Sequence, residues 1–224
     1  MPARAPDATR RNERSRKAIL RAAYELCGER SYERTSIEAI AARAGVGKQT
    51  IYRWWPSKGA VVMEALNDVV GAASDFPDTG DVIADLRQQM SAVSKLLSSP
   101  DFGPVYTGVI GAAQSDPAVA EALAGDIVTP RVIACRRRLE RAREQRQIRS
   151  DVDLDVAVEL LYGPIYHRLL LHTRPLAPDQ VTTVLETAFR GLSPDGTPPR
   201  SRRRASRRKA TISATAADPQ RPSA

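Results

Sequence analysis

Apolar residues recur at helical spacing along most of this 224-residue chain, and this periodicity restricts the fold more than any other feature. Apolar side chains fall three, four and seven positions apart from about residue 14 to residue 192; two such stripes are Ile19, Ala23, Leu26, Cys27 and Val82, Leu86, Met90, Val93, Leu97. This spacing predicts amphipathic helices. No stretch alternates apolar and polar residues between turn signals, as a half-buried strand would. The sequence therefore predicts an all-α fold of about nine helices.

Two prolines fall inside otherwise helical stretches. Pro130 lies within residues 116–147, and Gly163-Pro164 divides the most apolar stretch, residues 154–173. Proline lacks the backbone N–H and its ring clashes with the preceding helical turn, so we expect a kink or a break at Pro130 and a break at Gly163-Pro164.

The lengths of the apolar segments and the positions of cysteine and histidine argue against several classes of protein. No run of about 20 apolar residues, the length that spans a bilayer, occurs, and no apolar segment follows the basic N-terminus as in a secretory signal. We therefore expect a cytoplasmic protein with no membrane contact. The only two cysteines, Cys27 and Cys135, lie in apolar helical patterns and predict buried thiols rather than a disulfide or a zinc site. His167 and His172 are five residues apart and do not share a helix face, so neither a metal nor another cofactor is expected.

The net charge of +8 is distributed unevenly. Residues 1–58 carry 13 Lys and Arg against 6 Asp and Glu, residues 59–192 carry 13 against 18, and residues 193–224 carry 8 against 2. A basic end is typical of a protein that contacts phosphates, whereas the acidic middle is not expected to lie on DNA.

The composition also predicts unstructured ends. Residues 1–12 form a basic arm rich in Ala, Pro and Arg, and residues 193–224 form a basic tail with almost no apolar side chain. Neither buries enough surface to offset the entropy of ordering it. The arginine clusters of the tail, residues 202–204 and 207–209, either attract DNA non-specifically or keep the chain soluble, and both interpretations remain open.

The most informative segment is TSIEAIAARAGVGKQTIYRWWPSK, residues 35–58. It contains two short amphipathic patterns separated by Gly45, which suits a turn that requires a positive φ. The inward positions are apolar: Ile37, Ile40, Ala41, Val46 and Ile51. The second helix leaves polar and aromatic side chains exposed: Lys48, Gln49, Thr50, Tyr52 and Arg53. This arrangement predicts a helix-turn-helix whose second helix enters the major groove of DNA.

At these residues the chain resembles the tetracycline-repressor (TetR) family of transcription regulators. The resemblance rests on a capped helix that begins at Thr35-Ser36, the A-x-x-A-G-V turn from Ala41 to Val46, and the T-x-Y-x-W-W-P-S-K run from Thr50 to Lys58. A helical stretch at residues 14–29 precedes the motif at the family's usual distance. The resemblance implies a DNA-binding domain over residues 13–60, with its motif at about residues 36–55.

The family resemblance also implies roles for single residues. It places seven residues at the DNA: Ser36, Lys48, Gln49, Thr50, Tyr52, Trp54 and Lys58. Thr35 at the start of the motif and the exposed Arg53 are further candidates for DNA contact. Those matching Ser36 and Lys58 hold phosphates at helix starts, where free N–H groups favour an anion. By their chemistry Lys48 or Arg53 can read guanine and Gln49 can read adenine, and the sequence leaves the choice open.

Residues 61–192 are then expected to bind a small-molecule effector and to form a homodimer, and residues 161–176 resemble the C-terminal domain of one subgroup of the family. The dimer is expected to pair helices 154–173 and 178–192 with their twofold mates, through Leu161, Ile165, His167, Leu171, Val184 and Ala188. Candidate effector contacts are apolar and aromatic: Met90, Phe102, Tyr106 and Ile110. They suggest a hydrophobic or drug-like effector of unknown identity.

The expected function is that of a repressor which an effector releases from double-stranded, palindromic operator DNA. The helix at residues 57–72 is the expected mechanical link. An activator or a ligand-independent regulator would share every DNA-binding residue and remains an alternative. A helical carrier or enzyme is a remote alternative, because it leaves residues 35–58 unexplained. No Gly-rich phosphate loop or nucleophile elbow occurs, so the chain is not expected to be an enzyme.

Two groups of charged residues have structural interpretations. Asp151, Asp153 and Asp155 are expected to cap a helix, and Arg136, Arg137 and Arg138 are expected to form a solvated face.

Overall fold

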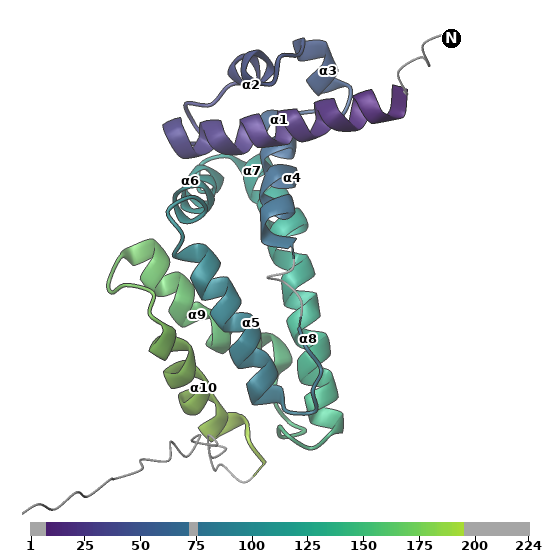
Figure 1. The fold of residues 1–224 in the computed structure, drawn as a ribbon. Helices are drawn as coiled ribbons and strands as arrows, with labels where there is room; N and C mark the ends of the chain where they lie inside the picture. The colour runs from purple at the N-terminus through teal and green to yellow at the C-terminus, as the bar shows by residue number, and fades with distance from the viewer. Residues whose placement is uncertain (1–7, 72–75, 195–224) are drawn as a thin grey trace, which may run out of the picture.

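The computed structural model describes residues 8–71 and 76–194, and these residues form helices and connecting turns without a strand (Figure 1). The helices are α1 (Ala8–Arg30), α2 (Ile37–Ala44), α3 (Lys48–Tyr52), α4 (Lys58–Val70), α5 (Val82–Leu97), α6 (Gly103–Ala113), α7 (Pro117–Ala122), the π-helix η2 (Leu123–Val128), α8 (Thr129–Glu144), α9 (Leu154–Leu171) and α10 (Pro178–Leu192). Because α7, η2 and α8 follow one another without a break, the described part contains nine separate helices. The predicted all-α fold is confirmed.

The first three helices form a head at one end of the molecule, with α1 lying across it and α2 and α3 on the outer side (Figure 1). The apolar stripe predicted for α1 is buried: Ile19, Ala23, Leu26 and Cys27 are at most 2% exposed. The prediction of an unstructured arm over residues 1–12 is wrong in part, because α1 already begins at Ala8. Arginine is a good helix former, and the Arg-rich stretch extends the helix beyond its buried face. Residues 1–7 and 195–224 lie outside the described part, so the rest of the arm and nearly all of the predicted tail do too.

Helix α4 leads from the head to the helices that follow it, α5 to α10, which together form the body of the molecule (Figure 1). Ser57 caps it as predicted, since its hydroxyl oxygen accepts a hydrogen bond from the Ala60 N–H at 3.2 Å. Along the helix, Val61, Val62, Met63 and Leu66 are fully buried. Helix α4 packs against α1 at its beginning and against α7 and η2 further along, so it contacts both the head and the body.

The structure contradicts the break predicted at Pro130. The helix continues from Pro117 to Glu144, and the turn that precedes Pro130 widens into η2. A wider turn moves the proline ring away from the carbonyl four residues earlier, which belongs to Asp126. That carbonyl, which loses its usual helical donor to the proline, accepts a hydrogen bond from Asn67 Nδ2 of α4 at 3.0 Å. The proline thus leaves an acceptor that α4 uses.

The break predicted at Gly163-Pro164 is also absent, since α9 runs unbroken through Pro164. Both neighbours of this turn on the inner face, Leu161 and Ile165, are fully buried, and their packing holds the helix together across the proline. Asp153 caps α9 as predicted, because its carboxylate accepts hydrogen bonds from the Asp155 and Val156 N–H groups.

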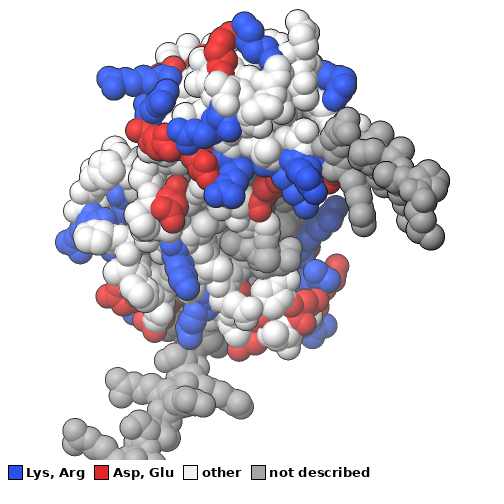
Figure 2. Space-filling view, turned by 45° about the horizontal axis from the view of Figure 1, so that its top comes forward, with Lys and Arg blue, Asp and Glu red and all other residues white. Residues whose placement is uncertain are grey.

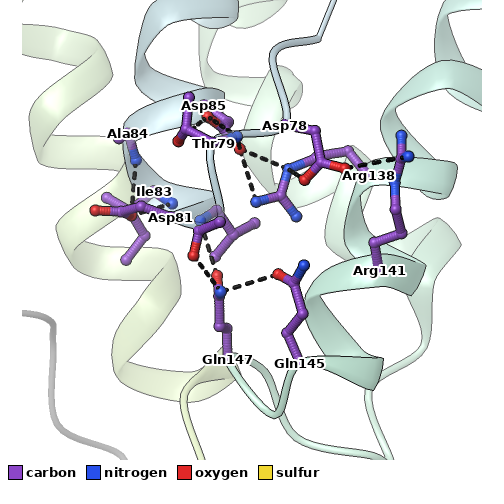
Figure 3. A network of polar contacts seen from close by, with 12 residues as sticks. Asp78, Thr79, Asp81, Ile83, Ala84, Asp85, Arg138, Arg141, Gln145 and Gln147 are labelled. Carbon is purple, nitrogen blue, oxygen red and sulfur yellow. Dashed lines mark hydrogen bonds and ion pairs between the residues drawn. The ribbon is translucent and has the colours of Figure 1, made fainter.

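The body of the molecule contains a buried ion pair between α5 and α8 (Figure 3). Arg138 is fully buried, and its Nε and Nη2 both lie 2.7 Å from Asp85 Oδ2. The Asp85 carboxylate also accepts hydrogen bonds from the backbone N–H of Thr79, at 3.2 and 3.3 Å, and from its hydroxyl at 2.7 Å. The prediction that residues 136–138 form a solvated face is therefore wrong for Arg138.

Further contacts fasten the segment before α5 to the end of α8 (Figure 3). Asp78 lies 3.2 Å from Arg141 and 3.8 Å from Arg138. Gln147 accepts a hydrogen bond from the Val82 N–H at 2.8 Å and donates one to the Gly80 carbonyl at 2.6 Å. Helices α5 and α8 are thereby joined by polar contacts as well as by apolar packing.

We expect Asp85→Asn to destabilise the fold by about 3–5 kcal/mol, because removal of one partner leaves the Arg138 charge buried without compensation. Urea unfolding followed by circular dichroism measures this loss. The matched control is Asp151→Asn, which removes an exposed carboxylate that lies 2.5 Å from Arg149. We expect the control to leave the midpoint unchanged within error, and equal midpoints for the two variants would contradict the assigned role of the buried pair.

Candidate nucleic-acid interface and interior cavity

The turn between α2 and α3 has the geometry of a helix-turn-helix. Ser36 caps α2, since its hydroxyl oxygen accepts from the Ala39 N–H at 3.2 Å. Gly45 ends the helix with a φ of +67°, and its N–H donates to backbone carbonyls of the last turn. This left-handed backbone favours glycine because a Cβ atom would crowd the following carbonyl. The turn predicted at Gly45 is therefore present.

Apolar side chains fix the angle between the two helices. Ile40, Ile51, Ile37, Ala41 and Trp55 are at most 7% exposed. Trp55 also donates a hydrogen bond from Nε1 to Glu64 Oε2 of α4 at 2.5 Å, and Arg16 of α1 forms an ion pair with the same carboxylate. Glu64 thus joins α1, the end of the α3 segment and α4. Sequence reasoning missed Glu64, which looks like an ordinary polar position of an amphipathic helix.

The outer surface of α3 presents most of the predicted DNA-contacting side chains together. Lys48, Gln49 and Arg53 are exposed and Thr50 is half-buried. Tyr52 is 50% exposed and Trp54 is 36% exposed. Basic side chains gather on this end of the molecule, where α1, α2 and α3 lie (Figure 2). The surface therefore combines cations with amide, hydroxyl and aromatic groups, the types that contact phosphates and base edges.

Lys48 has a partner on α2, since its Nζ lies 3.0 Å from Glu38 Oε1. The pKa of Glu38 is lowered, first by a hydrogen bond from its own backbone N–H at the start of α2 and then by Lys48. Both side chains are more than half exposed, so water screens their attraction and leaves Lys48 able to exchange Glu38 for another anion.

Two predicted DNA-contacting residues have other roles in this structure. Thr35 is 2% exposed, and its hydroxyl donates to the Ser31 carbonyl at 2.8 Å. The prediction that places it at the DNA is corrected, because its side chain closes the turn after α1. Lys58 is half-buried: its Nζ donates to the Tyr32 carbonyl at 2.9 Å and lies 4.1 Å from the centroid of the Tyr32 ring. Lys58 thereby ties the start of α4 to that turn.

A small cavity of about 90 Å³ lies between helices of the body. It is lined by Gln89, Val93, Tyr106, Val128, Arg131, Val132, Val158, Tyr162 and Tyr166. Of the four predicted effector contacts only Tyr106 lines it. Met90 and Phe102 are at most 2% exposed and belong to the close-packed core, and Ile110 packs against that core from outside the lining. These three residues are therefore not part of the lining of this cavity, and their contact with an effector stays a prediction.

Three tyrosines determine the chemistry of the cavity. The hydroxyls of Tyr106 and Tyr166 lie 3.0 Å apart, and the Tyr162 hydroxyl donates to Gln89 Oε1. Burial raises the pKa of Tyr106, Tyr162 and Tyr166, so all three hydroxyls stay protonated and able to donate at neutral pH. The i, i+4 spacing of Tyr162 and Tyr166 on α9 was the signal that sequence reasoning missed.

Both cysteines are free and buried, as predicted. Burial raises the pKa of Cys27 and raises that of Cys135 to about 12. At neutral pH both groups therefore remain thiols, which suits a packing role.

The predicted dimer residues divide into two groups. Leu161 and Ile165 are fully buried inside the subunit, so their assignment to an interface is corrected. His167 is exposed, Leu171 is 63% exposed, and Val184 and Ala188 are half-buried. The exposed apolar residues of α9 are Val156, Leu160, Leu170 and Leu171, at 40–63% exposure.

Comparison with known proteins identifies the family. A model described as "Bacterial regulatory proteins, tetR family" matches residues 19–65, and one described as "Tetracyclin repressor-like, C-terminal domain" matches residues 76–188. The chain belongs to the TetR family. Its HTH-type relative YdeS of Bacillus subtilis is 34% identical over 182 residues, 81% of this chain and 91% of YdeS.

Other TetR-family proteins agree with this assignment. The DNA-binding transcriptional repressor TetR of Mycobacteroides abscessus is 28% identical, over 72% of this chain and 85% of its own. The crystal structure of the TetR family transcription regulator SCO0332 is 37% identical, with a TM-score of 0.66, over 79% of this chain and 95% of that one. The predicted membership of the TetR family and the predicted function as a helix-turn-helix transcription regulator are thus confirmed. None of the described helices combines the length and apolar character needed to cross a membrane.

We expect Gly45→Ala to destabilise the head by about 1–2 kcal/mol, the cost of a left-handed conformation for a residue with a side chain. No atom lies within 4 Å of the added Cβ, so the loss comes from the backbone alone. Gly45→Asn should lose less, because asparagine tolerates this conformation. Thermal unfolding measures both, with Gly47→Ala as the control, since Gly47 has an ordinary φ of −78°. A loss no larger for Gly45→Ala than for Gly47→Ala would contradict this account.

Proposed function

We propose that the protein is a homodimeric repressor that binds palindromic operator DNA and is released by a small-molecule effector. The observation that carries the proposal is the outer surface of α3, which Gly45 and the buried Ile51 hold at a fixed angle to α2. Residues 13–60 would bind DNA, and residues 61–192 would hold the effector and the dimer contacts. Family membership supports this division, and it favours a regulator over a carrier or an enzyme.

In the proposed complex, α3 lies in the major groove. Lys48, Gln49, Thr50, Tyr52, Arg53 and Trp54 would contact bases and phosphates, and Ser36 and Lys58 would approach phosphates at the starts of α2 and α4. Lys48 would exchange Glu38 for DNA. Because its Nζ already donates to Tyr32, Lys58 would act mainly by holding the turn at residues 31–35 in place.

The effector would occupy the cavity beside Tyr106 in the body of the molecule. The Bacillus subtilis regulator FadR, solved with stearoyl-CoA, has the same fold, with a TM-score of 0.65 at 19% identity. This fold is therefore able to hold a small molecule. An effector would act by binding the DNA-bound and released states with different affinities.

An activator or a ligand-independent regulator would use the same α3 surface. Reporter output from the target promoter, compared between cells with and without this chain, distinguishes these functions. We expect output to rise when the chain is deleted. A fall in reporter output on deletion would show that the protein is an activator rather than a repressor.

For DNA binding we expect wild-type protein to enrich a palindromic site from fragmented genomic DNA at near-physiological salt. Lys48→Ala/Tyr52→Ala should bind that site at least about tenfold more weakly, since each good base contact contributes about 1–3 kcal/mol. The matched control is Lys95→Ala, which removes an exposed cation of α5 in the body. Equal enrichment by the double variant and the wild type would show that α3 does not read the site.

We expect the dimer to form through the exposed apolar face of α9 together with α10. Leu160→Asp/Leu171→Asp should convert the dimer to a monomer, because the change places two charges in an apolar interface. Light scattering after gel filtration measures the mass. The control is Ile133→Asp, which alters an apolar residue of α8 that is 44% exposed. A dimer that survives the double change, or one lost in the control, would place the interface elsewhere.

A further inference from the structure

The cavity contains one cation whose charge no carboxylate offsets. Arg131 lines it, and no carboxylate of the described residues lies within ion-pair distance of its guanidinium. Its Nη1 donates to the Ile127 carbonyl and its Nη2 to Asn67 Oδ1, at 3.0 Å for the second bond. Its Nε is buried and has no hydrogen-bond partner. The arginine therefore has an unused donor and an uncompensated charge.

The surroundings of Arg131 disfavour its charge. Burial lowers the pKa of Arg131, which means that its charged form is disfavoured there. Arg131 is half-buried, and an anion placed against its unpartnered Nε gains a charge-assisted hydrogen bond. In the Tyr106–Tyr166 hydrogen bond one hydroxyl donates to the other, so the second keeps its proton as a further donor to an anion. Val93, Val132 and Val158 provide an apolar wall.

We propose that this cavity binds a small organic carboxylate with an apolar or aromatic body, and that the carboxylate pairs with Arg131. The inference deepens the proposed function by naming the effector's chemical class, and it rests on that function for its regulatory meaning. The cavity of about 90 Å³ is smaller than the roughly 150 Å³ cavity known to hold benzene. A ligand of one ring or a short branched chain therefore requires the lining side chains to move outward.

Arg131 also connects the cavity to the helix that leads to the head. Its Nη2 donates to Asn67 Oδ1, and Asn67 Nδ2 donates to the Asp126 carbonyl at 3.0 Å, so α4 is held against η2 and α8 at one residue. A carboxylate that draws the guanidinium toward itself competes with Asn67. Further up α4, Glu64 is bonded to Trp55 beside α3. Loss of the Arg131–Asn67 bond thus weakens the contact of α8 with a helix that also holds the segment after α3 through Glu64.

The first test compares benzoate with benzamide, its neutral analogue of the same shape, by calorimetric titration or ligand-observed NMR. We expect wild-type protein to bind benzoate at least about tenfold more tightly, as for a hydrogen bond to a charged group. Arg131→Met should bind the two equally. Retained benzamide binding by Arg131→Met would show that its cavity is intact, and Arg131→Lys should keep part of the preference. Equal affinities in the wild type, no saturable binding of benzoate, or a preference that survives Arg131→Met would each overturn the proposed site.

The second test concerns the connection to α4 and uses hydrogen exchange of the full chain. Benzoate should speed exchange of the α4 amides in the wild type. Asn67→Ala should show fast exchange without ligand and no further response, while it keeps the preference for benzoate. Slow α4 exchange in the benzoate complex would overturn the connection.

The two proposals fail separately. Benzoate preference in a protein that enriches no DNA site would leave the carboxylate site standing and overturn the repressor. Operator binding together with equal affinities for benzoate and benzamide would overturn the carboxylate site and leave the repressor standing.

Discussion

The buried Asp85–Arg138 pair is the contact on which the body of the molecule depends. It joins the start of α5 to α8, and the surrounding contacts of Asp78 and Gln147 bring the segment before α5 onto the end of α8. A buried pair contributes less to net stability than to the choice of one arrangement, because an alternative packing leaves a charge unpaired. Residues of α5 and α8 both line the cavity, so its shape follows from this alignment.

Much of the fold follows from helical periodicity, and the exceptions have physical causes. The stripe of α1, the cap at Ser57 and the turn at Gly45 are local features, and their signals lie within a few residues. The burial of Arg138 depends on Asp85, 53 residues away, and three successive arginines do not reveal which one faces inward. The prolines at positions 130 and 164 led to predicted helix breaks. At each proline, packing of the residues before and after it outweighs the one lost backbone hydrogen bond.

The sites divide in the same way. The α3 surface was predictable because a short motif carries both its buried and its exposed positions. The cavity was not, because the largest apolar side chains, Met90 and Phe102, fill space, while the cavity lies where smaller side chains and tyrosines leave a gap. On α9 the sequence placed an outward apolar residue at Leu161, whereas the structure buries Leu161 and exposes its neighbour Leu160. That helix is apolar on nearly every side, so its pattern does not distinguish the subunit core from an outer face.

The widened turn before Pro130 ties together two residues that are distant in the sequence. Asn67 Nδ2 donates to the Asp126 carbonyl, which has no donor in residue 130 because that residue is proline, and Asn67 Oδ1 accepts from Arg131. If a residue with an N–H replaced the proline, that N–H would compete with Asn67 for the carbonyl. The two positions form one thermodynamic unit, so their separate replacements should not add in a double-mutant cycle. In a diverging lineage, they should change as a pair.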